Sequence, residues 1–380
     1  MSVIKKIFFL SLLFLGLSLL FWGVYNLSFR NPQVKQEEDN STASSDKTAS
    51  SNNIDKAKIA SISTKPILSP ILSANGIFIN YFSKTTGKLY QINLDGSNKK
   101  KLSDKTFSGL SQAFWSPDRS KAILKIQNAS SPFIYFNLEE KTSQPIKKNL
   151  DSLAWNATSN KIFYKFFNSQ SHIRSLSISN PDTSYWKKLS EIKYRNLSIA
   201  QVPQAGMVSF WNTGDAYKQT TLKTISLIGE DAKTIFQNKF GADYLWSPSG
   251  NKILISHSDS KGGYKTELAI INYKGGEYTN LNIPTFVSKC IWSKDSQSIY
   301  YALPGGIPDN SVLPNDYKNQ KFNTADTFWK INLKTGKKSR LVDLSDIQKK
   351  YDASQMFLSQ DESILFFVNR TDNKLYRITL

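Results

Sequence analysis

Residues 115–126 read WSPDRSKAILKI, and residues 246–256 read WSPSGNKILIS. Each stretch joins a Trp-Ser pair to a short polar turn and then to a run rich in aliphatic residues. Such a run, bounded by turn residues, is typical of a β-strand. The same order of features returns along the chain, so we interpret each stretch as one copy of an internal repeat.

The repeat recurs from about residue 66 to the last residue of the sequence. Two further clear copies begin at Trp155 and Trp292, and three weaker copies begin at Leu72, Gln201 and Leu358. The intervals between successive copies are 43, 40, 46, 45, 46 and 66 residues. A period in the forties that is built from short strands and turns is the signature of a β-propeller. We predict an all-β fold of seven four-stranded antiparallel blades, with six blades as the alternative.

A third strand can be recognised in several copies, at residues 88–94, 266–273, 328–333 and 374–380. The last of these ends the seventh copy, which therefore lacks a fourth strand of its own. An unpaired sheet edge is a liability that folded proteins avoid. We expect residues 58–63 (KIASIS) to supply the missing strand and close the ring.

The repeats resemble those of TolB-type propellers, the WD40-like or PD40 group. The segments that carry the resemblance are 115–126 with 88–103, and 246–256 with 267–276. The resemblance covers residues 66–380 and implies a propeller without specifying a function. TolB itself has a small α/β domain before a six-bladed propeller. This chain has an apolar segment and a polar segment there instead, which departs from the TolB pattern.

The apolar segment at residues 7–25 carries no charge, and Lys5 and Lys6 precede it. A helix of that length measures about 28 Å, close to the hydrocarbon thickness of a bilayer. Lysines before the segment favour an N-terminus on the cytoplasmic side. We predict a cytoplasmic end at 1–6, a single transmembrane helix at 7–27, a disordered polar tether at 28–57 and an extracytoplasmic propeller at 58–380. A cleaved signal peptide is the alternative.

Charge and cysteine content narrow the range of partners. The chain has 49 Lys and Arg against 30 Asp and Glu, a net charge of +19. The basic residues are spread along the chain, which is typical of a solubilising surface; attraction to an anionic surface is the alternative. The same spread disfavours nucleic acid as a partner. Cys290 is the one cysteine, so neither an internal disulfide nor a lipid-modified cysteine anchor is expected.

A polar position recurs three residues before each repeat anchor, whereas the residue just before the anchor is apolar. Residues two apart share one face of a strand, so each first strand begins polar and becomes buried. The first strand of a propeller blade lines the central channel. We therefore predict a polar ring at the channel mouth, with a channel-lining or a ligand-binding role. Its members are Ser69, Gln112, Ser152, Ser198, Asp243, Lys289 and Gln355.

The 66-residue interval contains an insertion at Pro304–Asp326, between the second and third strands of the sixth copy. Long loops inside compact domains are usually functional or disordered, and the sequence leaves both open. If the loop is functional, Asp309, Asp316 and Tyr317 are its candidate rim residues.

Catalytic, cofactor and metal motifs are not found in the sequence. It has no G-x-S-x-G elbow, Walker A loop or dinucleotide fingerprint, and its two histidines, His172 and His257, lack metal-ligand spacing. Asp118, Asp295 and Asp361 share one turn position, where an Asx turn is favoured over a general acid or calcium ligand. The recurring tryptophans are interpreted as packing between blades rather than as sugar platforms.

These observations predict a binding or scaffolding module rather than an enzyme, with no cofactor and no metal. The expected partner is an envelope protein, a peptide or a polyanion. The alternative is an enzyme that acts on cell-envelope glycans through carboxylates that converge on the propeller rim.

Overall fold

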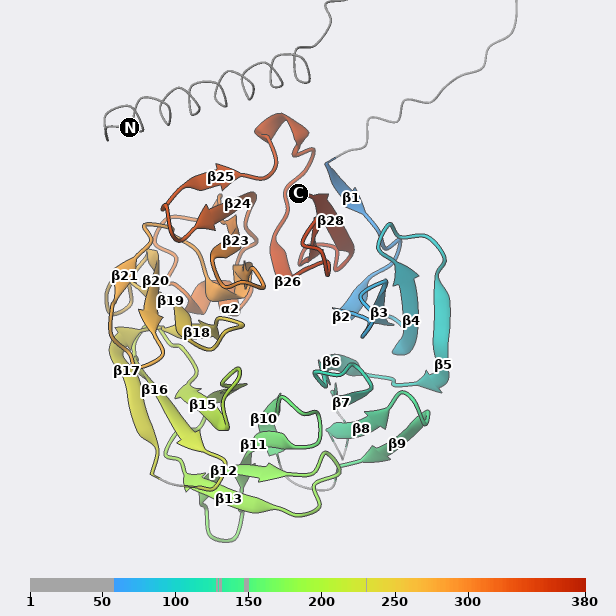
Figure 1. The fold of residues 1–380 in the computed structure, drawn as a ribbon, viewed down its shortest axis with the longest axis vertical. Coiled ribbons are helices and arrows are strands. Elements are labelled where there is room, and N and C mark those ends of the chain that lie inside the picture. Colours follow the sequence, from blue (N-terminus) through green and yellow to red (C-terminus); the bar gives the residue numbers. More distant parts are fainter. Residues whose placement is uncertain (1–57, 128, 130–131, 147–149, 230) are drawn as a thin grey trace, which may run out of the picture. The chain divides into compact units, whose positions relative to one another are not determined.

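The computed structural model describes residues 58–127, 129, 132–146, 150–229 and 231–380. Within them, seven four-stranded antiparallel sheets stand around a central axis, as Figure 1 shows. The predicted seven-bladed propeller is confirmed, and the six-bladed alternative is wrong. The predicted transmembrane helix and tether lie outside the described residues. No helix in the described part of the chain is long and apolar enough to span a bilayer.

Strand order follows chain order in blades 1 to 6. Blade 1 consists of β2 (Ile67–Leu72), β3 (Phe78–Ser83), β4 (Lys88–Asn93) and β5 (Lys100–Thr106). Blade 2 consists of β6 (Leu110–Trp115), β7 (Lys121–Ile126), β8 (Phe133–Asn137) and β9 (Thr142–Pro145). Blade 3 consists of β10 (Leu150–Trp155), β11 (Ile162–Phe167), β12 (Arg174–Ser179) and β13 (Lys187–Glu191). Blade 4 consists of β14 (Leu197–Gln201), β15 (Met207–Asn212), β16 (Gln219–Ser226) and β17 (Lys233–Phe240). Blade 5 consists of β18 (Asp243–Trp246), β19 (Lys252–Ser258), β20 (Thr266–Asn272) and β21 (Thr279–Asn280). Blade 6 consists of β22 (Cys290–Trp292), β23 (Ser298–Leu303), β24 (Thr327–Asn332) and β25 (Lys338–Arg340).

Blade 7 joins the two ends of the propeller. It consists of β26 (Ala353–Leu358), β27 (Ile364–Asn369), β28 (Leu375–Thr379) and β1 (Ile59–Ser61). β1 pairs antiparallel with β28, with Ile59 opposite Ile378 and Ser61 opposite Tyr376, and Figure 1 shows the two strands side by side. The expected closing strand is therefore confirmed.

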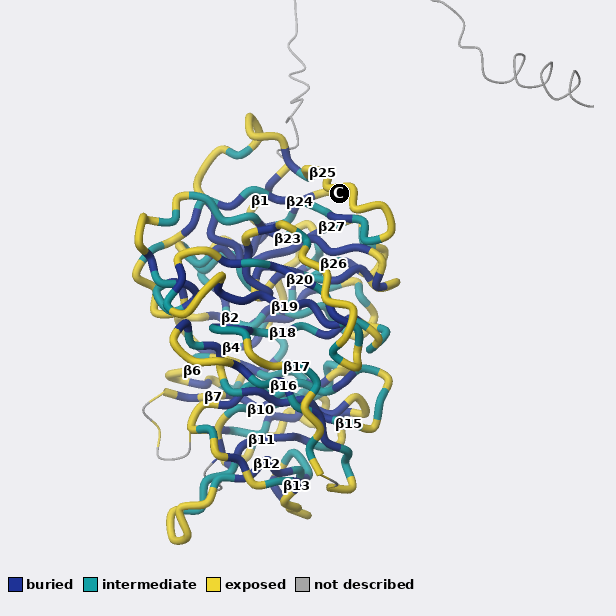
Figure 2. Tube along the Cα trace, turned by 90° about the vertical axis from the view of Figure 1, so that its left-hand side faces the viewer, coloured by how far each residue is buried: buried dark blue, intermediate teal, exposed yellow. Residues whose placement is uncertain are grey.

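The hydrophobic core is divided among the interfaces between adjacent blades. Of the eight clusters of buried residues in the described chain, seven each draw on two neighbouring blades, and the eighth joins Phe286 to Leu313 and Tyr317 of the insertion. One of them packs Ile67 and Ile79 of blade 1 against Phe366 and Leu375 of blade 7. Figure 2 shows burial along the strands and exposure at the loops. Burial of apolar surface between all neighbouring blades holds the ring closed.

The recurring tryptophans link the blades that contain them to the preceding blade. The indole Nε1 of Trp115 donates to the carbonyl of Ser69 at 2.8 Å, and that of Trp155 donates to the carbonyl of Phe114 at 2.8 Å. Trp292 makes the equivalent bond to Leu245 at 3.2 Å. The prediction that these residues pack between blades is confirmed.

The two ends of the channel are built differently, and we name them by their loops. The "turn face" carries the turns between the first and second strands of each blade. The "insert face" carries the loops between the second and third strands, which include residues 304–326 between β23 and β24. That insertion contains α2 (Asn315–Lys318), and Figure 1 places α2 near the inner ends of blades 5 to 7. Its predicted place in the sixth blade is confirmed.

Candidate functional site

The seven predicted ring residues lie on or next to the innermost strands of seven different blades. Six lie within β2, β6, β10, β14, β18 and β26, and the seventh, Lys289, immediately precedes β22. Gln112 and Gln355 are exposed, whereas Ser69, Ser152, Ser198 and Asp243 are partly buried. The positions therefore encircle the channel on the side of the insert face, whereas their role in binding stays a prediction.

The polar signal at these positions partly reflects the backbone. Ser69, Ser152 and Gln355 have left-handed backbone conformations, with φ between 48° and 52°, and each lies at a register shift in its strand. An extra residue in one strand forms a β-bulge, which turns the neighbouring side chains. The Ser69 hydroxyl then accepts a hydrogen bond from the Ala113 amide at 2.9 Å and links blade 1 to blade 2. Polarity at this position thus serves the scaffold as well as the channel.

Lys289 corrects the ring prediction, because its side chain is completely buried. It follows Phe286 in a 3₁₀ turn, Val287–Lys289, and its ammonium group points into protein instead of into the channel. The Nζ atom lies 2.6 Å from Asp326 Oδ2 and 2.7 Å from Asp352 Oδ1, and donates to the Ala353 carbonyl at 3.0 Å. A buried lysine that is shielded from water requires such partners, because an unpaired buried charge costs a large amount of folding free energy.

The ionic states of this buried group follow from its surroundings. Burial alone would lower the pKa of Lys289, but the two carboxylates and the Tyr317 hydroxyl raise it above its ordinary value. Burial likewise opposes ionisation of Asp352, yet Lys289 and Tyr317 outweigh it and lower the pKa of that carboxyl. Burial prevails at Asp326, whose pKa is raised. A charged lysine therefore holds an ionised Asp352, and the three side chains tie the insertion to blade 7.

The insertion is fastened to blades on both of its sides. Toward blade 4, Asn315 donates to Asp215 Oδ1 at 3.0 Å and accepts from the Ala216 amide at 2.8 Å. Toward blade 5, the Leu313 amide donates to the Gly263 carbonyl at 3.0 Å. Toward blade 7, the Tyr317 hydroxyl donates to Asp352 Oδ1 at 2.7 Å. The insertion, which belongs to blade 6, thus contacts blades 4, 5 and 7.

The three candidate rim residues have three different environments. Tyr317 is buried, and its ring stacks on Phe286 with centroids 4.7 Å apart, so it serves as an internal anchor of the insertion. Burial raises the pKa of Tyr317 to about 12, which keeps its hydroxyl protonated. Asp316 pairs with Lys321 at 2.7 Å. Asp309 is exposed and lines a separate cavity of about 520 Å³.

A small cavity lies between the insertion and the channel wall. Its volume is about 220 Å³, and most of its surface is apolar. Phe286, Val287, Pro314 and Tyr317 contribute the apolar surface, and Arg370 lies at its edge. Asp243 of the predicted ring also lines it. We call it the apolar cavity.

Gly241 shows how closely the insertion approaches blade 4. Its φ is +61°, and a Cβ atom at this position would lie 2.6 Å from Pro314 Cδ. Only glycine combines that conformation with that contact. The chain between blades 4 and 5 is therefore shaped to receive Pro314, which fixes one wall of the apolar cavity.

A larger groove lies on the other side of α2. It has a volume of about 860 Å³ and is lined by the loop before β14, the loop between β15 and β16, and the insertion. Four of its lining residues are cationic and one, Asp215, is acidic; the cations are Lys193, Arg195, Lys218 and Lys318. A hydrogen bond from Asn315 lowers the pKa of Asp215, which stays ionised. We call this surface the basic groove.

Buried Lys165 supports one wall of the basic groove. It lies in β11, pairs with Asp151 Oδ1 at 2.8 Å and donates to the carbonyl oxygen of Arg195. The backbone that carries Arg195 is thereby held by a side chain of blade 3, and the groove has a fixed edge.

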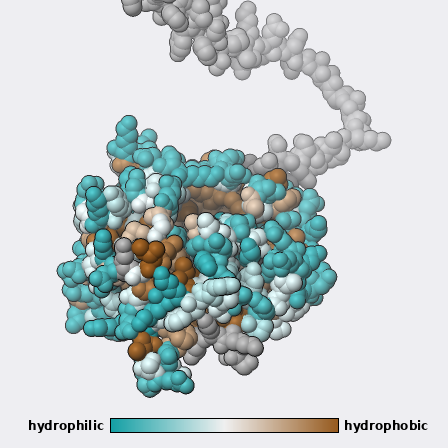
Figure 3. Space-filling view, turned by 60° about the horizontal axis from the view of Figure 1, so that its bottom comes forward, coloured by the Kyte–Doolittle hydropathy of each residue, from teal (hydrophilic) through white to brown (hydrophobic). Residues whose placement is uncertain are grey.

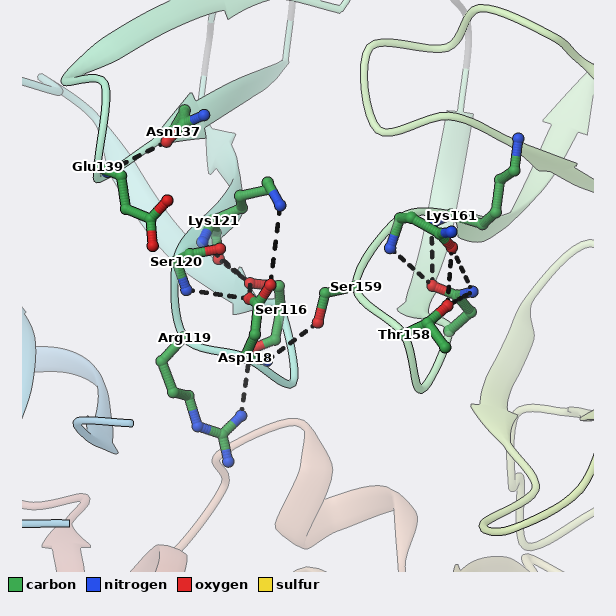
Figure 4. Close-up of polar contacts among 12 residues, drawn as sticks. Ser116, Asp118, Arg119, Ser120, Lys121, Asn137, Glu139, Thr158, Ser159 and Lys161 are labelled. Carbon is green, nitrogen blue, oxygen red and sulfur yellow. Dashed lines mark hydrogen bonds and ion pairs between the residues drawn. The ribbon is translucent and has the colours of Figure 1, made fainter. Parts of the chain in front are cut away.

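The aspartates of the turn face are structural. Asp118 Oδ1 accepts a hydrogen bond from the Ser120 amide at 3.0 Å, and the Asp118 amide donates to Ser159 Oγ of the next blade at 3.0 Å. Figure 4 shows this arrangement. Asp295 and Asp361 likewise accept from the amides of Gln297 and Ser363. The Asx-turn interpretation is confirmed at all three positions.

The candidate carboxylates do not meet in one cavity. Asp243 lines the apolar cavity, Asp309 lines a different one, and Asp316 is paired with Lys321. Within the described residues, no group of three or more His, Cys, Asp or Glu side chains is placed to hold a metal ion. Asp243, Asp309 and Asp316 therefore do not form a paired-carboxylate centre.

Several residues of this region were missed by sequence reasoning. Arg370 lies with its guanidinium 4.2 Å from the centre of the Tyr317 ring, and Asp352 pairs with Lys289. Phe286, Lys193 and Arg195 were also not singled out. None of them belongs to the repeat, so the unusual length of the insertion was the one signal that pointed to this region.

The fold defines the class of protein, a seven-bladed propeller with an insert over one end of its channel. No protein-family model matches the chain, and no curated protein matches it. Hydrophilic residues cover most of the side shown in Figure 3, with hydrophobic residues gathered in smaller areas. Because neither comparison by sequence finds a match, the similarity of this chain to known proteins rests on its fold.

Solved structures with a similar fold were found. Oligogalacturonate lyase from Vibrio parahaemolyticus is 12% identical, covers 84% of this chain and 93% of its own, and has a TM-score of 0.61. The propeller domain of the Trilobed protease from Pyrococcus furiosus is 15% identical, with coverages of 82% and 92% and a TM-score of 0.53. A putative TolB from Agrobacterium tumefaciens is 17% identical, with coverages of 58% and 86% and a TM-score of 0.45.

At these identities the similarity shows the propeller fold alone. The propeller that the resemblance implied is shown by the seven sheets of this chain, whereas membership of the PD40 group stays a prediction. The Trilobed protease propeller is described as having an open velcro topology. Here β1 pairs with β28 and closes the last blade.

Proposed function

We propose that this propeller is a non-catalytic binding module whose partner docks on the insert face. The observation that carries the proposal is the insertion itself, which is anchored to blades 4, 5 and 7 and forms a shared wall of two adjoining cavities. Pockets with convergent polar groups are the default location of ligand sites. An anchored wall supports binding, since a preorganised surface has little entropy to lose on association.

The proposed setting is the outer side of the cytoplasmic membrane, with the N-terminal segment 7–27 as a single-pass anchor and 28–57 as a tether. A tether would let the rigid disc reach a partner in the envelope while the helix keeps it at the membrane surface. The partner classes are an envelope protein, a peptide or a polyanion. The basic groove supports each of them, because all can carry negative charge.

The alternative is an enzyme that acts on cell-envelope glycans. Glycosidases of the common type use two carboxyl groups about 5–10 Å apart that flank one bond. Asp243, Asp309 and Asp316 do not line a common cavity, so the described geometry favours binding. Release of reducing ends from cell-wall material by the purified full-length protein would instead support the enzyme.

Site-specific crosslinking in intact cells tests the binding face. A photoreactive amino acid is placed in the full-length protein at the exposed insert-face positions Gln112 and Asn319, and at the exposed turn-face positions Pro117 and Gln360. We expect one defined crosslinked species, identified by mass spectrometry, from the insert-face positions only. Equal crosslinking from both faces, or none from the insert face, rejects the proposal.

A shortened insertion provides the second half of the test. Replacement of residues 305–325 by a short Gly-Ser linker removes Tyr317 and α2 but keeps Asp326 as the partner of Lys289. We expect the Gln112 crosslink to disappear while β-sheet circular dichroism is retained. A crosslink of unchanged yield in this variant shows that the insertion is not part of the binding face.

A further inference from the structure

The apolar cavity and the basic groove form one composite surface. Both are lined by Lys318, and α2 contributes Tyr317 to the cavity and Asn315 to the groove. A ligand that crosses α2 would therefore meet an apolar pocket and a row of cations in succession. This juxtaposition specifies a ligand with two chemical features at once.

The apolar cavity is suited to a single side chain. Its volume of about 220 Å³ lies below the range of about 300–1,000 Å³ that is typical of small-molecule pockets. Its walls are fixed, because the Tyr317 ring stacks on Phe286 with an interplanar angle of 4° and Arg370 covers Tyr317 from 4.2 Å. A rigid pocket of this kind rewards the burial of one aromatic or aliphatic group.

The basic groove is suited to carboxylates. Asp215 already pairs with Asn315 and Lys218, so it neutralises only part of the cationic charge. Lys193 and Arg195 are exposed, and no ion pair joins either of them to a carboxylate in the described chain. Arginine binds carboxylates through two parallel hydrogen bonds, which makes it selective as well as attractive.

We propose that this composite surface binds an acidic peptide segment of a partner protein, with one apolar side chain in the cavity and flanking carboxylates in the groove. The inference rests on the proposed function and names the ligand class for it. A peptide fits better than a polyanionic glycan, because a glycan has no apolar side chain to fill the cavity. The groove alone would suit either ligand.

The test uses full-length protein in nanodiscs and a fluorescent peptide of four glutamates around a central phenylalanine. Binding is measured by fluorescence anisotropy at low and moderate salt. We expect saturable binding that weakens about tenfold or more when serine replaces the phenylalanine or glutamine replaces the glutamates. Failure of the wild-type protein to bind this peptide overturns the inference.

Two variants assign the binding to the composite surface. The double substitution Lys193→Gln with Arg195→Gln removes two groove cations and should weaken binding about tenfold. Ser288→Trp starts from an exposed residue that lines the apolar cavity, so the new ring should fill the cavity and abolish the preference for phenylalanine over serine. The matched control is Lys334→Gln with Lys337→Gln, which removes two exposed lysines of the β24–β25 turn and should leave affinity unchanged.

The outcomes separate this inference from the proposed function. If the control pair weakens binding as much as the groove pair, the attraction is general and the inference is wrong. If the wild-type protein binds dextran sulfate but binds the peptide with phenylalanine no better than the peptide with serine, the surface is a polyanion site and the peptide assignment is overturned. Crosslinks from Asn319 in cells would still support the insert face in either case.

Discussion

The turn face and the insert face of the propeller are stabilised in different ways. On the turn face one device is repeated, in which a serine such as Ser116, Ser293 or Ser359 accepts a hydrogen bond from the amide that starts the second strand, at 2.9 Å in each case. On the insert face, Lys289, Asp326 and Asp352 meet once, from segments far apart in sequence. A repeat builds the scaffold, and a single-copy insertion builds the candidate site.

The largest loss of stability is expected from a substitution at Lys289. Lys289→Met removes the ammonium group that lies between two buried carboxylates, and the loss of one partner of a buried ion pair costs about 3–5 kcal/mol. We expect a fall of that size in the free energy of unfolding, measured by urea denaturation. Adding Asp326→Asn, which removes one of the stranded charges, should recover part of the loss. A free energy of unfolding for Lys289→Met within about 1 kcal/mol of wild type would contradict the role assigned to Lys289.

The closing strand is a single-copy feature of a different kind. Ile59, in the outer strand of blade 7, is buried in the cluster between blades 6 and 7 and lies opposite Ile378. Ile59→Ala leaves a cavity at the junction of the ring and should cost about 2–5 kcal/mol in the free energy of unfolding. Limited proteolysis should also cut the variant faster near residue 58. Exposed Ile77 provides the control, because Ile77→Ala should change stability by about 0.5 kcal/mol or less.

Trp155→Phe tests the repeated device between blades. It removes the indole that donates to the Phe114 carbonyl and leaves that acceptor without its partner, so we expect a loss of about 1–3 kcal/mol. Trp329→Phe is the matched control, since the Trp329 indole donates only to Thr327 within its own strand. Thermal denaturation of the two variants should separate them. Equal losses would show that the inter-blade hydrogen bond adds nothing to ring packing.

The smallest expected effect concerns the turn face at low pH. Hydrogen bonds from Ser359 and Ser363 lower the pKa of Asp361 to about 2. A lowered folded-state pKa gives stability that is present above the unfolded value, near 3.8, and is lost as the pH falls toward 2. Asp361→Asn keeps the acceptor oxygen but cannot titrate, so its melting temperature should fall less between pH 4 and pH 2. A pH profile parallel to that of wild type would show that Asp361 does not contribute to the pH dependence of stability.

The repeat allowed the scaffold to be predicted from the sequence because its signals are local. Trp115, Ser116 and Asp118 contact residues a few positions away or residues of the adjacent repeat. Successive copies of one pattern therefore specify the strands, the turns and their number. The same reasoning located the closing strand, since a blade with three strands needs a fourth.

The environment of the polar-ring side chains could be predicted only in part from local sequence patterns. The strand register predicted seven polar positions around the channel; six lie within innermost strands and the seventh, Lys289, immediately precedes one. The structure exposes Gln112 and Gln355 but buries Lys289 completely. Whether a lysine faces water or a pair of carboxylates depends on segments that no pattern around it describes.

The sequence alone determined the seven blades, the closing strand and the position of the insertion, because periodic apolar residues and turn residues act over short distances. Only the tertiary structure decided which blades the insertion contacts and which groups it brings together. Tyr317, Asp352 and Arg370 come from separate loops, and their meeting depends on the closed ring. Contacts made once, between distant residues, leave no repeated pattern in the chain from which they could be inferred.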